Sequence, residues 1–264
     1  MKSFSEILRE IRVLYSTGAY EKIEVSNLEE LNLAMTIFPE RAREAFVLAA
    51  ETKSIYPFQE LNSKELNKLR LIDARLALVV VTCAALGPNK LTVLEGIRSL
   101  KRQKELFAEK KTWTMTSNHL TGNAVDIAPL PMSWEWGDFY PIADQMDAAA
   151  DLWEIPLTWG SAWDQTTEQW DDSLTAQKHY KQIRRAQGRK ATLDGPHWEI
   201  PASYQKGNKE AKDAIRGLQH KYNHINSLGV QILADGFYGD KTAAAVRELV
   251  SLMVEDPANV LNRL

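Results

Sequence analysis

Two short segments that lie far apart in the sequence constrain most strongly how this chain can fold. The first holds His119 and Asp126, and the second, some seventy residues further on, holds Asp194 and His197. Two imidazoles and one carboxylate form the ligand set of a catalytic zinc ion that keeps one coordination position open. If the fold brings the two segments together, the chain is a metal-dependent hydrolase.

The residues of this pattern suit successive steps of metal-assisted hydrolysis. A zinc ion held by His119, Asp126 and His197 would lower the pKa of its bound water to about 7. A general base must then take the proton and pass it to the leaving amine, and Asp194 is placed for this three residues before His197. Arg98, which we expect at the start of a helix, can hold a substrate carboxylate or stabilise the developing oxyanion.

The same residues also allow simpler interpretations. A histidine and an aspartate at this spacing occur by chance, Asp194 can be a turn residue beside Gly195, and His197 can be a hydrogen-bonded core residue. The whole pattern favours a metal site, because two of only five histidines lie in such segments with a carboxylate nearby. His220 and His224 lie four residues apart on an expected helix without a third ligand, which favours a surface position.

Composition and charge argue against several other classes of protein. The net charge of −3 gives no electrostatic reason to bind nucleic acid. The single cysteine, Cys83, excludes a disulfide framework, and its apolar surroundings indicate a core residue rather than a nucleophile. No stretch approaches the roughly 18 apolar residues of a membrane span, and the N-terminus does not resemble a secretory signal. We therefore expect a cytoplasmic monomer that does not insert into membranes.

The hydrophobic patterns predict an α+β fold with a small antiparallel sheet, flanking helices and further helices at both ends. We divide the chain into a helical extension of unknown role (residues 1–55), a catalytic domain (56–205) and a third, helical block (206–264), with a linker at Gly207 and Asn208. The expected strands are residues 91–95, 125–128, 157–159 and 197–200. The expected helices beyond the extension start at residues 62–65, 98, 142, 209 and 242, whereas residues 161–191 show no clear period and predict an insertion or loop.

Several motifs follow one another in an order that resembles a known family. They are residues 93–99, Gln103, residues 117–129, residues 157–160 and residues 194–199. Their order and spacing resemble the zinc peptidases of bacterial cell walls, the D-alanyl-D-alanine carboxypeptidase and L-alanyl-D-glutamate endopeptidase family, and above all its bacteriophage endolysin branch. This resemblance covers roughly the catalytic domain. It implies zinc-dependent hydrolysis of an amide bond in the peptide stem of peptidoglycan.

The resemblance also implies roles for individual residues. It assigns His119, Asp126 and His197 as zinc ligands and Asp194 as the catalytic base. Arg98 would stabilise the transition state or anchor the substrate. The resemblance adds Ser117 and Gln103 as residues that line the substrate site, and Glu199 as an acidic residue that contacts a metal ligand. The implied target is the L-alanyl-D-glutamate bond, and a D-alanyl-D-alanine carboxypeptidase is the alternative. Residues 161–191 exceed the usual family connection, so they can form a lid, a substrate-binding element or a regulatory element.

The third block carries a second resemblance. Leu218-Gln219, the turn at residues 235–239 and Thr242 are similar to a small three-helix peptidoglycan-binding domain. The glycines of the turn allow a tight bend, and Thr242 lies near the start of the last helix. That family usually closes on an aromatic–glutamine pair, where this chain has Leu249-Val250. The resemblance implies bacterial peptidoglycan as partner, and the alternative is a helical cap that stabilises the enzyme without binding anything.

Together the two resemblances imply an endolysin that lyses the bacterial host of a phage. Such an enzyme would stay in the host cytoplasm until it is released to the cell wall, or would be carried in the virion to degrade the wall at infection. An alternative from another class is a wall-binding virion protein with a degenerate peptidase domain. The presence of the metal ligands and the base argues against that alternative.

Overall fold

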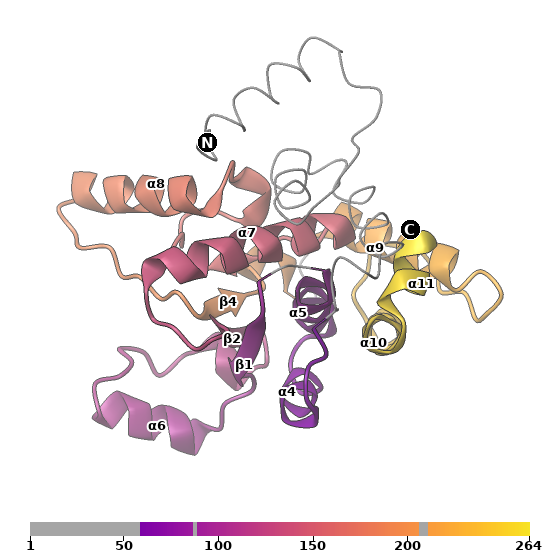
Figure 1. Cartoon of the computed structure of the whole chain (residues 1–264), viewed down its shortest axis with the longest axis horizontal. Coiled ribbons are helices and arrows are strands. Elements are labelled where there is room, and N and C mark those ends of the chain that lie inside the picture. Colours follow the sequence, from indigo (N-terminus) through magenta and orange to yellow (C-terminus); the bar gives the residue numbers. More distant parts are fainter. Residues whose placement is uncertain (1–58, 87–88, 206–210) are drawn as a thin grey trace, which may run out of the picture.

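The computed structural model describes residues 59–86, 89–205 and 211–264, which form a mixed α+β arrangement (Figure 1). The helices expected within residues 1–55, and the expected linker at Gly207 and Asn208, lie outside these ranges. The domain boundaries at residues 55 and 205 stay predictions. Within the described ranges, no helix has both the length and the apolar character needed to cross a bilayer.

A four-stranded antiparallel sheet with the order β1-β2-β4-β3 lies at the centre of the catalytic part. All four strands lie where the apolar patterns predict them. The sheet register places Asp126 of β2 opposite His197 of β4 on one side and opposite Glu95 of β1 on the other. The strands are β1 (Leu91–Glu95), β2 (Ala124–Pro129), β3 (Thr158–Trp159) and β4 (His197–Glu199).

Two of the helices near the sheet begin at residues whose side chains cap them. Helix α4 (Ser63–Leu69) starts with a capping box between Asn62 and Glu65, as the sequence predicts. Helix α6 (Leu100–Ala108) is capped by Ser99. Arg98 therefore lies in the loop before this helix, whereas the sequence predicts it at the start of the helix. Helix α5 (Ala74–Leu86) contacts α7 and α10. Its Cys83 is buried, as expected.

Helix α7 (Trp136–Trp153) starts before the predicted residue 142 and has Pro141 in its interior. A proline cannot donate the helical hydrogen bond and usually interrupts a helix, which is why the pattern predicted a later start. Pro141 is exposed and lies in the second turn, so α7 continues through it.

The segment of residues 161–191 contains helix α8 (Ser173–Ala186), so the prediction of a loop was wrong for this part. Asp172 caps α8 by accepting a hydrogen bond of 2.7 Å from the backbone of Thr175. The buried face of α8 consists of small, polar and aromatic side chains, and this mixture hides the helical period from an apolar pattern. These buried residues are Ser173, Ala176, Gln177 and Tyr180.

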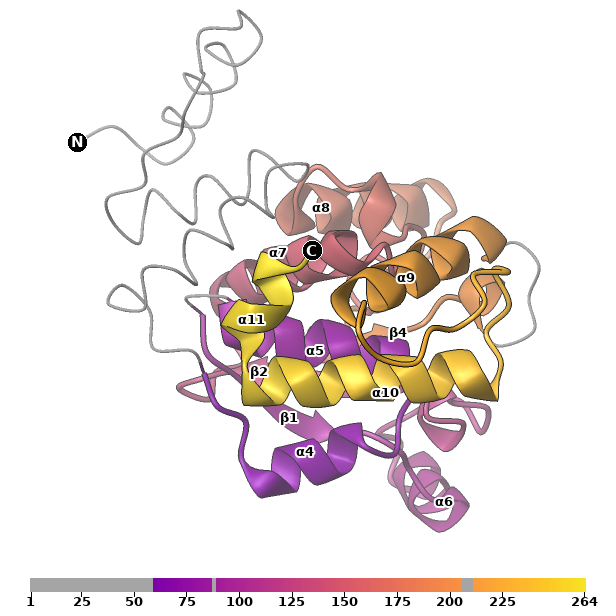
Figure 2. The same ribbon diagram turned by 90° about the vertical axis from the view of Figure 1, so that its right-hand side faces the viewer.

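Three helices complete the chain, α9 (Lys212–Ile225), α10 (Asp240–Glu255) and α11 (Pro257–Asn262). Figure 2 shows α10 lying along α5, and the two helices are in contact. Buried residues of α10, among them Val246 and Leu249, belong to the same hydrophobic cluster as the buried face of α5. These C-terminal helices are therefore packed onto the catalytic part. His220 and His224 are exposed on α9, as expected.

Candidate metal centre

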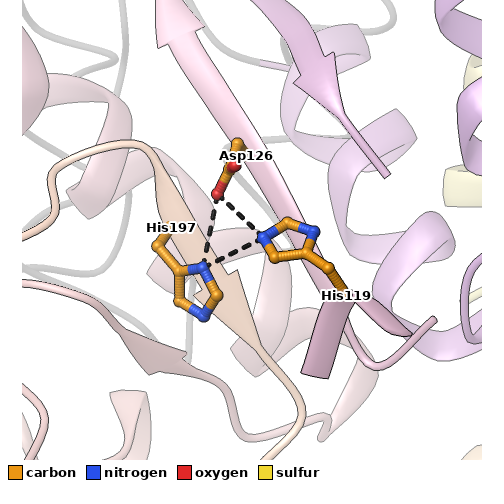
Figure 3. Close-up of side chains that lie close together, drawn as sticks. All are labelled: His119, Asp126 and His197. Carbon is orange, nitrogen blue, oxygen red and sulfur yellow. Dashed lines mark hydrogen bonds and ion pairs between the residues drawn. The ribbon is translucent and has the colours of Figure 1, made fainter. Parts of the chain in front are cut away.

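His119, Asp126 and His197 come together from three separate elements (Figure 3). His119 lies in the short 3-10 helix η2 (Asn118–Leu120), Asp126 lies in β2, and His197 begins β4. After η2 the chain turns at Gly122, whose φ is +75°, and re-enters the sheet at β2. The pairing of β2 with β4 then sets Asp126 beside His197. The sheet register, rather than sequence proximity, thus assembles the group.

The potential ligand atoms form a nearly equilateral triangle. Nε2 of His119 lies 3.2 Å from Nδ1 of His197 and 3.2 Å from Oδ1 of Asp126. The remaining side, from Oδ1 of Asp126 to Nδ1 of His197, is 3.3 Å. Ligands that lie about 2.0–2.1 Å from a tetrahedral zinc ion are separated from one another by about 3.3 Å. The triangle therefore fits three corners of such a site.

Hydrogen bonds on the far side of each imidazole direct its lone pair towards this triangle. Nδ1 of His119 lies 2.7 Å from the carbonyl oxygen of Gly96, which can only accept, so this nitrogen carries the proton. Nε2 of His197 lies 2.9 Å from a carboxylate oxygen of Glu199 and donates to it in the same way. Glu199 thus contacts a candidate ligand, as expected. Such partners behind histidine ligands are a regular feature of metal sites.

The charges around the triangle favour a cation in its centre. Burial opposes the charge of Asp126, but its contacts with His119 and His197 outweigh this cost and hold the pKa of Asp126 well below its usual range. Burial also opposes protonation of His197, yet its hydrogen bonds to Asp126 and Glu199 raise its pKa to about 9. A metal ion bound by both imidazoles would take the place of a proton on His197, because a ligating imidazole nitrogen must be unprotonated.

Asp194 approaches the triangle because Gly160 allows two segments to touch. The backbone N–H of Asp194 donates to the carbonyl of Gly160 at 2.8 Å, and the N–H of Gly160 donates to the carbonyl of His197 at 2.8 Å. A Cβ atom at position 160 would overlap the carbonyl oxygen of Asp194 and lie 2.9 Å from Cβ of His197. Burial, only partly offset by the neighbouring His197, raises the pKa of the Asp194 carboxyl.

Arg98 is fixed beside the triangle by its neighbours. Its guanidinium donates to Glu95 at 2.9 Å and to Gln103 at 2.9 Å, and it lies 3.6 Å from a carboxylate oxygen of Asp126. Gln103 is fully buried and does not line the cavity, so the expectation that it lines the substrate site was wrong. Gln103 also donates to the carbonyl of Thr114 at 2.7 Å, and its observed role is to hold Arg98.

A cavity of about 680 Å³ opens over the triangle. Its lining includes the three candidate ligands, Asp194, Arg98 and Ser117. Helices α6 and α8 lie on opposite sides of the strands (Figure 1), and both contribute residues to the cavity. Sequence reasoning missed several lining residues, among them Trp113, Trp163, Tyr180 and Arg184. For the last three, the polar and aromatic composition of residues 161–191 was the available signal.

One family of known proteins matches more than half of the chain. A sequence model described as phage L-alanyl-D-glutamate peptidase matches residues 58–200, a range that includes all the candidate ligands and α8. No curated protein is detectably similar to the chain. Among solved structures, the L-Ala D-Glu endopeptidase ChiX of Serratia marcescens is 27% identical, with a TM-score of 0.40 over 53% of this chain and 87% of that one.

Proposed function

This chain belongs to the phage L-alanyl-D-glutamate peptidase family, and from that premise we propose that it is a zinc-dependent peptidase of peptidoglycan. Its proposed substrate bond is the amide between L-alanine and D-glutamate in the peptide stem. The observation that carries the proposal is the triangle of His119, Asp126 and His197, in which two imidazole nitrogens and one carboxylate oxygen lie 3.2–3.3 Å from one another. Imidazole with carboxylate is a ligand set that suits zinc.

The residues around the triangle divide the work of hydrolysis between them. A zinc ion bound there would polarise the scissile carbonyl and make a water molecule a better nucleophile near neutral pH. Asp194 accepts the proton of the water that attacks the alanyl carbonyl carbon. It then passes this proton to the nitrogen of D-glutamate as the C–N bond breaks. Arg98, held by Glu95 and Gln103, stabilises negative charge on the carbonyl oxygen.

We further propose that the enzyme is an endolysin and that residues 206–264 form a domain that binds the cell wall. A wall-binding domain would raise the local concentration of the enzyme on an insoluble polymer. In this proposal the enzyme works as a monomer and stays in the host cytoplasm until it is released to the wall. The support is the phage family to which the catalytic part belongs, together with the motif resemblance of the C-terminal helices.

Digestion of purified peptidoglycan tests the proposed bond. Mass spectrometry of the products is expected to show new N-terminal D-glutamate on the peptide stems and L-alanine left on the glycan. Loss of the terminal D-alanine alone would instead identify a carboxypeptidase and overturn the proposed specificity.

Metal analysis of the same preparation tests the proposed cofactor. We expect about one zinc ion per chain, because the triangle is one site with three protein ligands. Chelation should abolish activity, and added zinc should restore it. Full activity of a zinc-free preparation would overturn the zinc mechanism. The His220→Ala variant is a matched control, because His220 is exposed on α9 and should leave both zinc content and activity unchanged.

A further inference from the structure

Helix α8 contributes two side chains to the cavity that holds the candidate metal ligands. Tyr180 and Arg184 are one turn apart on α8, and both line this cavity. Trp163, which precedes the helix, lines it as well, with its ring centroid 5.1 Å from that of His197. The wall on the α8 side therefore continues from the metal site to Arg184.

Among the residues that the structure describes, Arg184 has no ion-pair partner, unlike the other basic residues of the cavity. Arg102 lies 3.7 Å from Glu105 and Lys111 lies 2.8 Å from Glu109, while Arg98 is paired with Glu95 and Asp126. Arg184 is the only lysine or arginine of the cavity lining without an ion pair to another described residue. Its Nε is shielded from solvent and has no hydrogen-bond partner within residues 59–86, 89–205 and 211–264. A shielded guanidinium donor without a partner is unfavourable unless a ligand supplies an acceptor.

The proposed substrate carries such an acceptor beside the bond to be cut. D-glutamate has two carboxyl groups, and only one of them is needed to continue the peptide stem. The other is a free carboxylate close to the scissile nitrogen. A guanidinium binds a carboxylate through two parallel hydrogen bonds and is therefore the side chain best suited to recognise it.

We propose that Arg184 binds the free carboxylate of the D-glutamate residue and so makes α8 the specificity element of this enzyme. The inference rests on the proposed function, and it assigns the segment of residues 161–191 a role in substrate binding. A purely structural role would be to complement the C-terminal end of α8, where basic side chains are favourable. Arg185 also lies in the last turn of α8 and can fill that structural role. Unlike Arg184, it is exposed and does not line the cavity.

Two synthetic peptides that differ in one group test the proposal. Both contain L-alanine joined to D-glutamate, which continues through its side-chain carboxyl to L-lysine. One keeps the free α-carboxylate of glutamate, and the other carries a carboxamide there. We expect the wild-type enzyme to prefer the acid. Arg184→Gln should lower kcat/KM for the acid by roughly 10- to 100-fold, mostly through KM, and for the amide by less than about threefold.

The controls separate substrate recognition from folding. Arg184→Lys should retain part of the preference for the acid, and Arg185→Gln should retain all of it. Thermal unfolding and zinc content should be the same in all variants. A wild-type enzyme that cuts both peptides equally well, or an Arg184→Gln variant that loses the same factor on both, would overturn the inference and leave the proposed function standing. A wild-type enzyme that cuts neither peptide would overturn both.

Discussion

The backbone N–H of Asp73 donates a hydrogen bond of 2.7 Å to the carbonyl of Gly122. This bond joins the turn between α4 and α5 to the loop that connects His119 with Asp126. Gly122 takes a left-handed conformation there, with φ +75°, and packs against the backbone of the same turn. The shape of the loop between two candidate metal ligands thus depends on a turn much earlier in the sequence.

Replacing Gly122 by alanine should disturb this support. An alanine at positive φ is strained, and its Cβ would lie 3.0 Å from the carbonyl oxygen of Leu71. We expect a loss of about 1–3 kcal/mol in the free energy of unfolding, together with weaker zinc binding. Denaturant unfolding and zinc titration measure the two effects. The control is Gly137→Ala in α7, where a Cβ atom meets nothing within 4 Å. Equal stability of the two variants would contradict the prediction.

Arg247 of α10 should support the same loop from a greater distance. Its guanidinium donates to the carbonyl oxygens of Leu69 and Ile72, which lie in and next to the turn that contacts Gly122. Arg247→Ala removes these bonds and should destabilise the protein by about 1–3 kcal/mol. Because the turn supports the loop, zinc affinity should fall as well. Lys241→Ala, an exposed change on the same helix, is the control. Unchanged zinc affinity in Arg247→Ala would show that α10 does not support the loop between His119 and Asp126.

A pair of variants should separate metal binding from proton transfer. His119→Ala removes one of the three proposed ligands and is expected to lose both zinc and peptidase activity. Asp194→Asn leaves the ligands in place but cannot accept a proton, so it should keep zinc and lose about 10²- to 10⁴-fold in kcat. Metal analysis and peptide cleavage of the same samples make the comparison. Substantial activity in Asp194→Asn would exclude Asp194 as the base.

The stability of the protein should fall as the pH rises from about 4 to about 6 because of Asp151 in α7. Burial and the nearby Glu168 carboxylate, partly offset by Lys221, raise the pKa of Asp151 to about 6. The folded state therefore binds more protons than the unfolded state in this window, and the extra stability is lost as Asp151 ionises. Asp151→Asn should weaken this dependence of stability on pH. It should also raise the free energy of unfolding by up to about 2 kcal/mol at pH 7.

Unfolding free energies at pH 4.5, 6 and 7.5 measure this effect. Asp171→Asn, which removes an exposed carboxylate, should leave the slope unchanged. Asp144 and Asp147 on the same helix also have raised pKa values because they are buried, so some slope should remain in Asp151→Asn. An identical slope in Asp151→Asn and wild type would refute the assignment.

Local sequence signals predicted the elements that depend on local chemistry. The hydrophobic patterns predicted all four strands, and the side chains of Asn62 and Glu65 marked the start of α4. Such local signals did not reveal α8, because most side chains on its buried face are polar or small. They also misplaced Gln103, since nothing in the sequence shows that its amide holds Arg98 and Thr114 instead of facing the cavity.

The sequence by itself predicted the chemistry, because the types and order of His119, Asp126, Asp194 and His197 are those that a metal-assisted hydrolase needs, and the match to a peptidase family agrees with hydrolysis. Only the tertiary structure decided how these groups meet. The pairing of β2 with β4 brings Asp126 beside His197, and the close approach at Gly160 brings Asp194 to them. Such contacts depend on backbone segments far apart in the chain, and a local pattern carries no information about which segments pair.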